Sequence, residues 1–87
     1  MITTKYLPHS EMNNILKNRS AELRKHHCYS TWYYDKDDND IVICTTRPGL
    51  WLGVLGKDVA NLKDKLDEAA IKHHIEPVKI SFIECNS

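Results

Sequence analysis

The sequence predicts an α+β fold whose elements follow the order α-β-β-α-α-β. Two observations support this prediction: apolar residues recur at helical spacing in two long stretches, and three short stretches have the apolar and aromatic composition of strands. The 87 residues suffice for one domain with a modest core, which we expect over about residues 10–84. Hydrophobic residues make up 41% and charged residues 28% of the chain, values typical of a globular protein rather than a disordered one.

The first predicted element is an amphipathic helix over residues 10 to about 26, with Ser10 as its N-cap. Its apolar positions at helical spacing are Met12, Ile15, Leu16 and Leu23. The run 28–34, rich in aromatic residues and Thr, predicts a strand, and the acidic segment 35–40 predicts a turn. The apolar run 41–44 predicts a second strand, buried on both faces, and we expect the two strands to form a hairpin.

The second half of the chain predicts two more helices and a last strand. Pro48 and Gly49 end the second strand, so only about one helical turn fits before Gly53. A long helix then runs from Lys57 to about His73, with apolar positions at Val59, Leu62, Leu66, Ala69 and Ala70. Alternation over residues 78–84 predicts a half-buried strand. Because a strand–helix–strand crossover joins parallel neighbours, we expect a three-stranded mixed sheet with three helices packed on one face.

The net charge of zero hides an uneven distribution along the chain. Residues 1–34 carry five cations against two acids, a net charge of +3, and these cations are Lys5, Lys17, Arg19, Arg24 and Lys25. Residues 35–40 carry four acids against one lysine, a net charge of −3. The local positive charge of the first third is what a nucleic-acid partner requires.

The number and spacing of the cysteine, histidine and apolar residues argue against several classes of protein. Three unclustered cysteines, Cys28, Cys44 and Cys85, argue against a disulfide framework and fit a reducing compartment. No apolar run reaches the roughly 18 residues of a membrane span, and no apolar signal core is present, so we expect a cytoplasmic protein without a membrane partner. Zinc-ligand spacing and a nucleophile–base pairing are both missing. We therefore expect no metal, no cofactor and no enzymatic activity.

The most informative segment is Arg47-Pro48-Gly49, three apolar residues, and then the Gly-x-x-Gly stretch from Gly53 to Gly56. With the order of elements over residues 10–84, this motif resembles a type II KH domain, the form found in the small-subunit ribosomal protein near where mRNA enters. The resemblance implies a type II KH-like fold in which Gly53–Gly56 clamps about four single-stranded nucleotides. The motif is also physically suitable, because glycines let the backbone approach a phosphate and the following helix N-terminus offers unpaired N–H groups.

Two groups of residues are the expected RNA contacts. The first surrounds the motif and comprises Arg47, Trp51, Gly53, Val54, Leu55, Gly56, Lys57 and Lys63. The second lies on the first helix and comprises Lys17, Arg24 and Lys25. The chain departs from the family at Val54 and Leu55, where RNA-binding members often carry Lys or Arg. Two exposed apolar side chains there can pack on a sugar or base, or can bind a protein.

Two functions therefore remain open for this chain. The first is a small, free-standing, non-enzymatic RNA-binding regulator of low sequence specificity that takes single-stranded or structured RNA. The alternative is a protein-binding adaptor or inhibitor, for example a phage-type viral antagonist of a host nuclease, with RNA as a co-ligand. Strand alternation also turns Trp32 or Tyr33 away from the helices, and such an aromatic patch on a sheet favours a homodimer.

Overall fold

The computed structural model of the protein describes residues 6–85, so Lys5, counted above with the basic first third, lies outside the described residues. Its elements are α1 (His9–Arg24), β1 (Ser30–Asp35), β2 (Asp40–Thr45), α2 (Pro48–Leu52), a 3₁₀ turn η1 (Val54–Gly56), α3 (Lys57–Lys72) and β3 (Lys79–Glu84). The predicted α+β class and the order α-β-β-α-α-β are confirmed.

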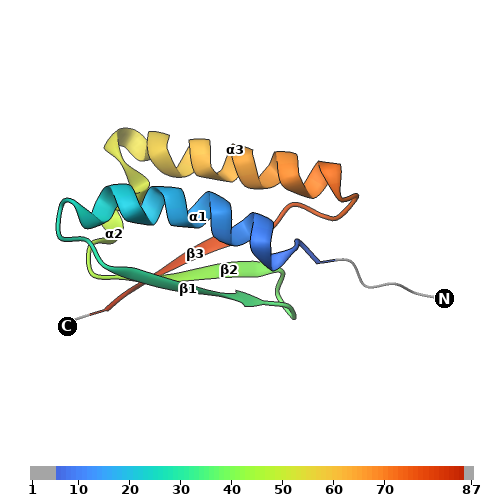
Figure 1. Cartoon of the computed structure of the whole chain (residues 1–87), viewed down its shortest axis with the longest axis horizontal. Coiled ribbons are helices and arrows are strands. Elements are labelled where there is room, and N and C mark those ends of the chain that lie inside the picture. Colours follow the sequence, from blue (N-terminus) through green and yellow to red (C-terminus); the bar gives the residue numbers. More distant parts are fainter. Residues whose placement is uncertain (1–5, 86–87) are drawn as a thin grey trace.

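The three strands form one mixed sheet with β2 in the centre. β1 pairs with β2 antiparallel, which confirms the predicted hairpin, and Trp32 lies opposite Ile43. β2 pairs with β3 in parallel, as the crossover required, and Ile43 lies opposite Phe82. In Figure 1, α1 and α3 run in opposite directions over one face of this sheet, α2 lies at one end of the same layer, and the other face stays open.

The core lies between the helices and the inner face of the sheet. β2 contributes Ile41, Val42 and Ile43, which are all buried, as the apolar run predicted. Ile41 and Ile43 belong to the core under the helices, whereas Val42 lies on the open face between its strand neighbours Tyr33 and Ser81. Each long helix contributes the apolar stripe that its spacing predicted, and the buried side chains are Met12, Leu16 and Leu23 of α1 with Leu62, Leu66, Ala69 and Ala70 of α3. The two helices thereby hold α2 and η1, which connect β2 to α3, against the end of the sheet.

The start of α1 differs from the prediction. The helix begins at His9, Pro8 occupies the N-cap position, and no side chain caps the helix. Ser10 therefore lies inside the first turn and is not the N-cap, because the fixed φ of Pro8 already starts the turn and its carbonyl accepts the hydrogen bond of Met12 at 3.0 Å. The helix ends at Arg24 instead of residue 26, since residues 25–27 form a turn with a positive φ at His27.

The strand β1 separates its aromatic residues onto two faces. Trp32 points toward α1, where its indole Nε1 donates a hydrogen bond to Asn13 Oδ1 at 2.9 Å. Tyr33 points the opposite way and is 53% exposed on the open face, where Tyr29 is exposed as well. The alternation predicted for this strand is thus confirmed, while the homodimer expected through this patch stays a prediction.

Over residues 6–85, no helix combines the length and the apolar composition that crossing a membrane requires.

Candidate nucleic-acid interface

The glycine loop, which we define as Gly53–Gly56, joins α2 to α3 at one end of the molecule (Figure 1). Three of its residues have positive φ, +77° at Gly53, +57° at Leu55 and +72° at Gly56. Two backbone hydrogen bonds close the turn, because Gly53 N–H donates to the Gly49 carbonyl at 3.0 Å and Gly56 N–H donates to the Gly53 carbonyl at 3.3 Å. The chain therefore reverses tightly and enters α3 without an intervening segment.

The two glycines are required for different reasons. Gly53 combines φ +77° with ψ −178°, a backbone region that essentially only glycine occupies. A Cβ at this position would also overlap the side chain of Asp58, whose own Cβ would lie only 2.7 Å away. Gly56 caps α3 in the left-handed conformation, and a Cβ there would meet only Val59, at 4.0 Å. Position 53 therefore requires glycine because of both its backbone conformation and the nearby Asp58 side chain, whereas position 56 requires it because of backbone conformation alone.

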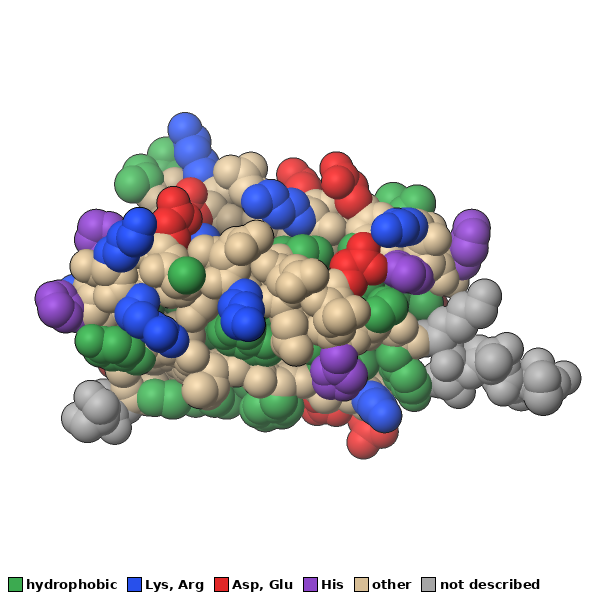
Figure 2. All heavy atoms as spheres, in the orientation of Figure 1, with side chains coloured by type: hydrophobic (Ala, Val, Ile, Leu, Met, Phe, Trp, Pro, Cys, Tyr) green, Lys and Arg blue, Asp and Glu red, His purple; other side chains and the backbone are tan. Residues whose placement is uncertain are grey.

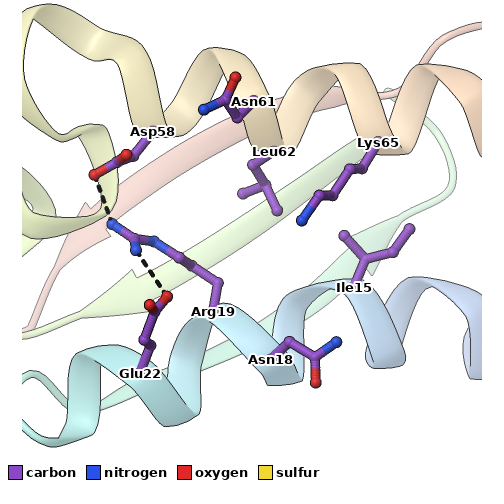
Figure 3. Close-up of a pocket in the computed structure, with 8 residues that line it drawn as sticks. All are labelled: Ile15, Asn18, Arg19, Glu22, Asp58, Asn61, Leu62 and Lys65. Carbon is purple, nitrogen blue, oxygen red and sulfur yellow. Dashed lines mark hydrogen bonds and ion pairs between the residues drawn. The ribbon is translucent and has the colours of Figure 1, made fainter.

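One arginine of α1 connects the elements that flank the glycine loop. Arg19 Nη2 donates to Asp58 Oδ2 of α3 at 2.8 Å and Nη1 donates to Glu22 Oε2 at 3.1 Å (Figure 3). Nη2 also donates to the Leu50 carbonyl of α2 at 2.9 Å. We call this set of contacts the Arg19 bridge. It forms one wall of a cavity of about 320 Å³ between α1 and α3. Two carboxylates offset the guanidinium charge, so Arg19 positions the loop and adds little positive potential to it.

A chain of hydrogen bonds connects α2 to the β1–β2 hairpin. The indole Nε1 of Trp51 donates to Ser30 Oγ at 2.8 Å, and Ser30 Oγ donates to Thr45 Oγ1 at 2.9 Å. Arg47 N–H also donates to Thr45 Oγ1, at 3.3 Å, and the Cys28 thiol lies 3.2 Å from the same oxygen. These contacts satisfy the buried hydroxyl of Thr45 and fix the start and the middle of α2 against the hairpin.

The tip of the glycine loop is apolar and open to solvent. Val54 is 79% exposed and Leu55 is 92% exposed, the two highest values among the large hydrophobic side chains described. Leu55 also holds the left-handed conformation that non-glycine residues adopt at a cost of about 1–2 kcal/mol. A strained, exposed leucine in a tight turn contributes little to folding, which is the pattern expected of a residue kept for contact with a ligand.

The structure divides the expected contacts of the motif into surface and core residues. Arg47 and Lys57 are exposed at the two ends of the segment and are free to meet a phosphate. Trp51 is 0% exposed, so its indole is a core group, and the expectation that this side chain contacts RNA is corrected by its burial and its bond to Ser30. Lys63 pairs with Asp67 one turn later on α3, which offsets its charge.

The cations expected on the first helix do not surround the glycine loop. Lys17 and Arg24 line a groove on the β1 side of α1, together with Ser30 and Trp32. On the side of the loop, Arg19, Glu22 and Leu23 of α1 and His26 of the turn after it line a more apolar groove of about 450 Å³ with Leu50, Gly53 and Val54. Lys25 is exposed at the C-cap of α1. Lys17 and Arg24 thus border a different groove from the glycine loop.

Sequence reasoning missed the Arg19 bridge, although a signal for it exists. Arg19 lies three residues after Leu16 and four before Leu23, so helical spacing places it on the buried stripe. A guanidinium on a buried face requires partners, because an unpaired buried charge is costly. The structure shows that the partner is Asp58 in the first turn of α3, 39 residues away along the chain.

Comparisons of the chain with models of protein families, with curated proteins and with solved structures find no match. The class of protein that the fold defines is thus a small α+β protein with a three-stranded mixed sheet. The type II KH resemblance rests on the segment from Arg47 to Gly56 and on the order of elements. Within the described part of the chain, no cluster of three or more His, Cys, Asp or Glu side chains is arranged to hold a metal ion.

Proposed function

We propose that this chain is a small, non-enzymatic RNA-binding protein in which the glycine loop holds the RNA backbone, as it does in type II KH domains. The observation that carries the proposal is the conformation of the loop, with positive φ at Gly53, Leu55 and Gly56 between two helices. The two glycines of the turn leave its backbone without a Cβ at both ends, which lets a phosphate approach the backbone closely. The order of elements and the parallel β2–β3 pair support the proposal further.

The electrostatics of the loop region support weak, nonspecific binding. Arg47 and Lys57 are the exposed cations at the motif, while Arg19 and Lys63 are paired with carboxylates. Two phosphate contacts on a single strand give a slope of log K against log salt of about −1.4. Base contacts and apolar contacts of Val54 and Leu55 then supply most of the salt-independent affinity.

The test is a fluorescence-anisotropy titration of labelled single-stranded and hairpin RNAs over a salt series. We expect Leu55→Asp to weaken binding at least about fivefold, because it places a carboxylate beside the bound phosphate, at a cost of roughly 1 kcal/mol. Asp tolerates the left-handed backbone of position 55, so the variant should fold. Ile71→Asp is the matched control, since Ile71 is 70% exposed near the other end of α3.

Two results would contradict the RNA proposal: no saturable RNA binding by the wild type, or equal binding by the Leu55→Asp and Ile71→Asp variants. Substitution of Gly53 by Asp is a poorer test, because the new side chain would collide with Asp58 and disturb folding as well as binding.

A second function, recognition of a protein partner, is favoured by one observation. The apolar tip formed by Val54 and Leu55 carries no charge, unlike a loop suited to phosphate alone. The double variant Val54→Ser/Leu55→Ser removes this apolar surface without adding charge. If RNA binding persists in this variant and in Leu55→Asp, the loop serves a protein partner and the RNA-clamp assignment is wrong.

A further inference from the structure

A second groove, on the opposite side of α1 from the glycine loop, has features that the RNA proposal does not use. We call it the edge groove; it lies between α1 and the outer edge of β1 and has a volume of about 380 Å³. α1 lines it with Lys17, Ser20 and Arg24, and β1 lines it with Ser30 and Trp32. Figure 2 shows several Lys and Arg side chains over α1 on this face, with acidic side chains beside them on the side toward α3.

The floor of the edge groove is an unpaired strand edge. β1 is an outer strand of the sheet, so alternate residues direct their N–H and C=O groups away from β2. Tyr29 and Thr46 hydrogen-bond across the hairpin, with Thr46 N–H donating to the Tyr29 carbonyl at 3.0 Å. By alternation, Thr31 and Tyr33 also bond inward, and the backbone groups of Ser30, Trp32 and Tyr34 face outward. These three residues can therefore pair with an added strand.

The wall of the edge groove carries two cations that lack a carboxylate. Among residues 6–85, neither Lys17 nor Arg24 takes part in an ion pair, in contrast to Arg19 on the opposite side of the same helix. Lys17 and Arg24 are seven positions apart, about 10.5 Å along the helix axis. In an extended chain, side chains on one face recur about every 6.8 Å. The distance of about 10.5 Å between the two cations therefore lies between the spacing of carboxylates two residues apart and that of carboxylates four residues apart.

We propose that the edge groove binds an extended peptide in which acidic and apolar residues alternate, added to the sheet as a fourth strand beside β1. The backbone of the peptide pairs with Ser30, Trp32 and Tyr34. Its acidic side chains lie on the α1 side, beside Lys17 and Arg24. Its apolar side chains lie on the open face, beside the exposed rings of Tyr29 and Tyr33.

Charge and backbone chemistry favour this occupant over two others. A second copy of this chain paired through β1 would bring Lys17 and Arg24 of both copies against each other, and like charges repel. An RNA strand could meet the two cations, but it has no peptide backbone to satisfy the row of outward groups on β1. The alternating peptide satisfies the cations, the strand edge and the open face together.

The test uses a labelled peptide of about ten residues in which Glu alternates with Val, a length typical of a strand. We expect saturable binding by fluorescence anisotropy, with amide exchange slowed at Ser30, Trp32 and Tyr34 and unchanged at Thr31 and Tyr33. Lys17→Gln/Arg24→Gln should weaken binding roughly fivefold to tenfold, from the loss of two exposed ion pairs. Lys65→Gln/Lys79→Gln, which removes the same charge from exposed sites on α3 and β3, should leave it unchanged.

Each remaining outcome overturns the proposal. These outcomes are no saturable binding, equal binding of a peptide with Gln in place of Glu, protection of amides outside β1, and equal binding by the two double variants. The peptide site is distinguished from the RNA site by Leu55→Asp, which changes the glycine loop and should keep peptide binding.

Discussion

The two ends of the α1–α3 pair are held together in different ways. At the loop end, the Arg19 bridge joins α1 to Asp58 and to a backbone carbonyl of α2, and the Arg19 side chain is only 22% exposed. At the other end, Glu11 of α1 hydrogen-bonds to His73, which follows α3, and its Oε1 lies 3.7 Å from Lys72 Nζ. We call the contacts of Glu11 with His73 and Lys72 the far-end contact.

This difference shows at which end α1 is joined more firmly to its neighbouring elements. The Arg19 bridge fixes backbone as well as side chains, so losing it leaves a carboxylate and a carbonyl without a donor. The far-end contact joins side chains alone and fixes no backbone group, and Lys72 is 71% exposed. Exposed pairs of this kind contribute little to stability. Of the two ends, the loop end is therefore the one at which a single substitution should have the larger effect.

The largest effect is expected from Gly53→Ala. The new Cβ would overlap Asp58 and force alanine into a backbone region reserved for glycine, so we expect a loss of about 2–3 kcal/mol in the free energy of unfolding. Gly56→Ala keeps space around its Cβ and should lose only about 1 kcal/mol. Urea denaturation of both variants measures the difference. Equal losses would show that the contact with Asp58 does not constrain position 53.

A smaller loss, about 2 kcal/mol, is expected from Arg19→Ala. The substitution removes hydrogen bonds to a carboxylate and a carbonyl that are partly buried. Arg24→Ala is the matched control on the same helix, and its exposed side chain should change stability by less than about 0.5 kcal/mol. Urea denaturation again gives both values. If the two variants are equally stable, the Arg19 bridge contributes no stability and the contrast between the two ends fails.

The smallest effect is expected at the far-end contact and depends on pH. The hydrogen bond from His73 and the nearby charge of Lys72 hold the pKa of Glu11 below its ordinary value of 4.5. A carboxylate with a lowered folded-state pKa stabilises the protein above the unfolded pKa, and this contribution is lost as the pH falls through the folded pKa. We expect the urea midpoint of the wild type to fall more steeply below about pH 4.5 than that of Glu11→Gln. Parallel curves for the two proteins would show that Glu11 is not coupled to folding.

Local patterns predicted most of the fold. Helical spacing located α1 and α3, the run 41–44 located the central strand, and Pro48 with Gly53 bounded α2. The end points were less accurate, because Pro8 and not Ser10 starts α1. The parallel neighbours β2 and β3 followed from connection rules, which apply once the element types are known.

The candidate site was predictable only where a motif marks it. The glycine loop was identified from the sequence, but the burial of Trp51 was not, because it depends on contacts with Ser30 of a strand 21 residues away. The partners of Arg19, Leu50 and Asp58, are likewise 31 and 39 residues distant. The separation of Lys17 and Arg24 from the loop follows from the orientation of α1 over the sheet, which local sequence does not encode.

The positions of the two tryptophans make each proposed surface observable by spectroscopy. Trp51 lies in the core directly behind the glycine loop, and Trp32 lines the edge groove. The chain has no other tryptophan, so Trp32→Phe leaves emission that reports on α2 alone. A ligand on the loop should then change the emission of Trp51 only if it displaces α2, whereas a strand added at β1 should quench or shift Trp32 directly. The intrinsic fluorescence of this protein can therefore distinguish occupancy of its two grooves without any attached label.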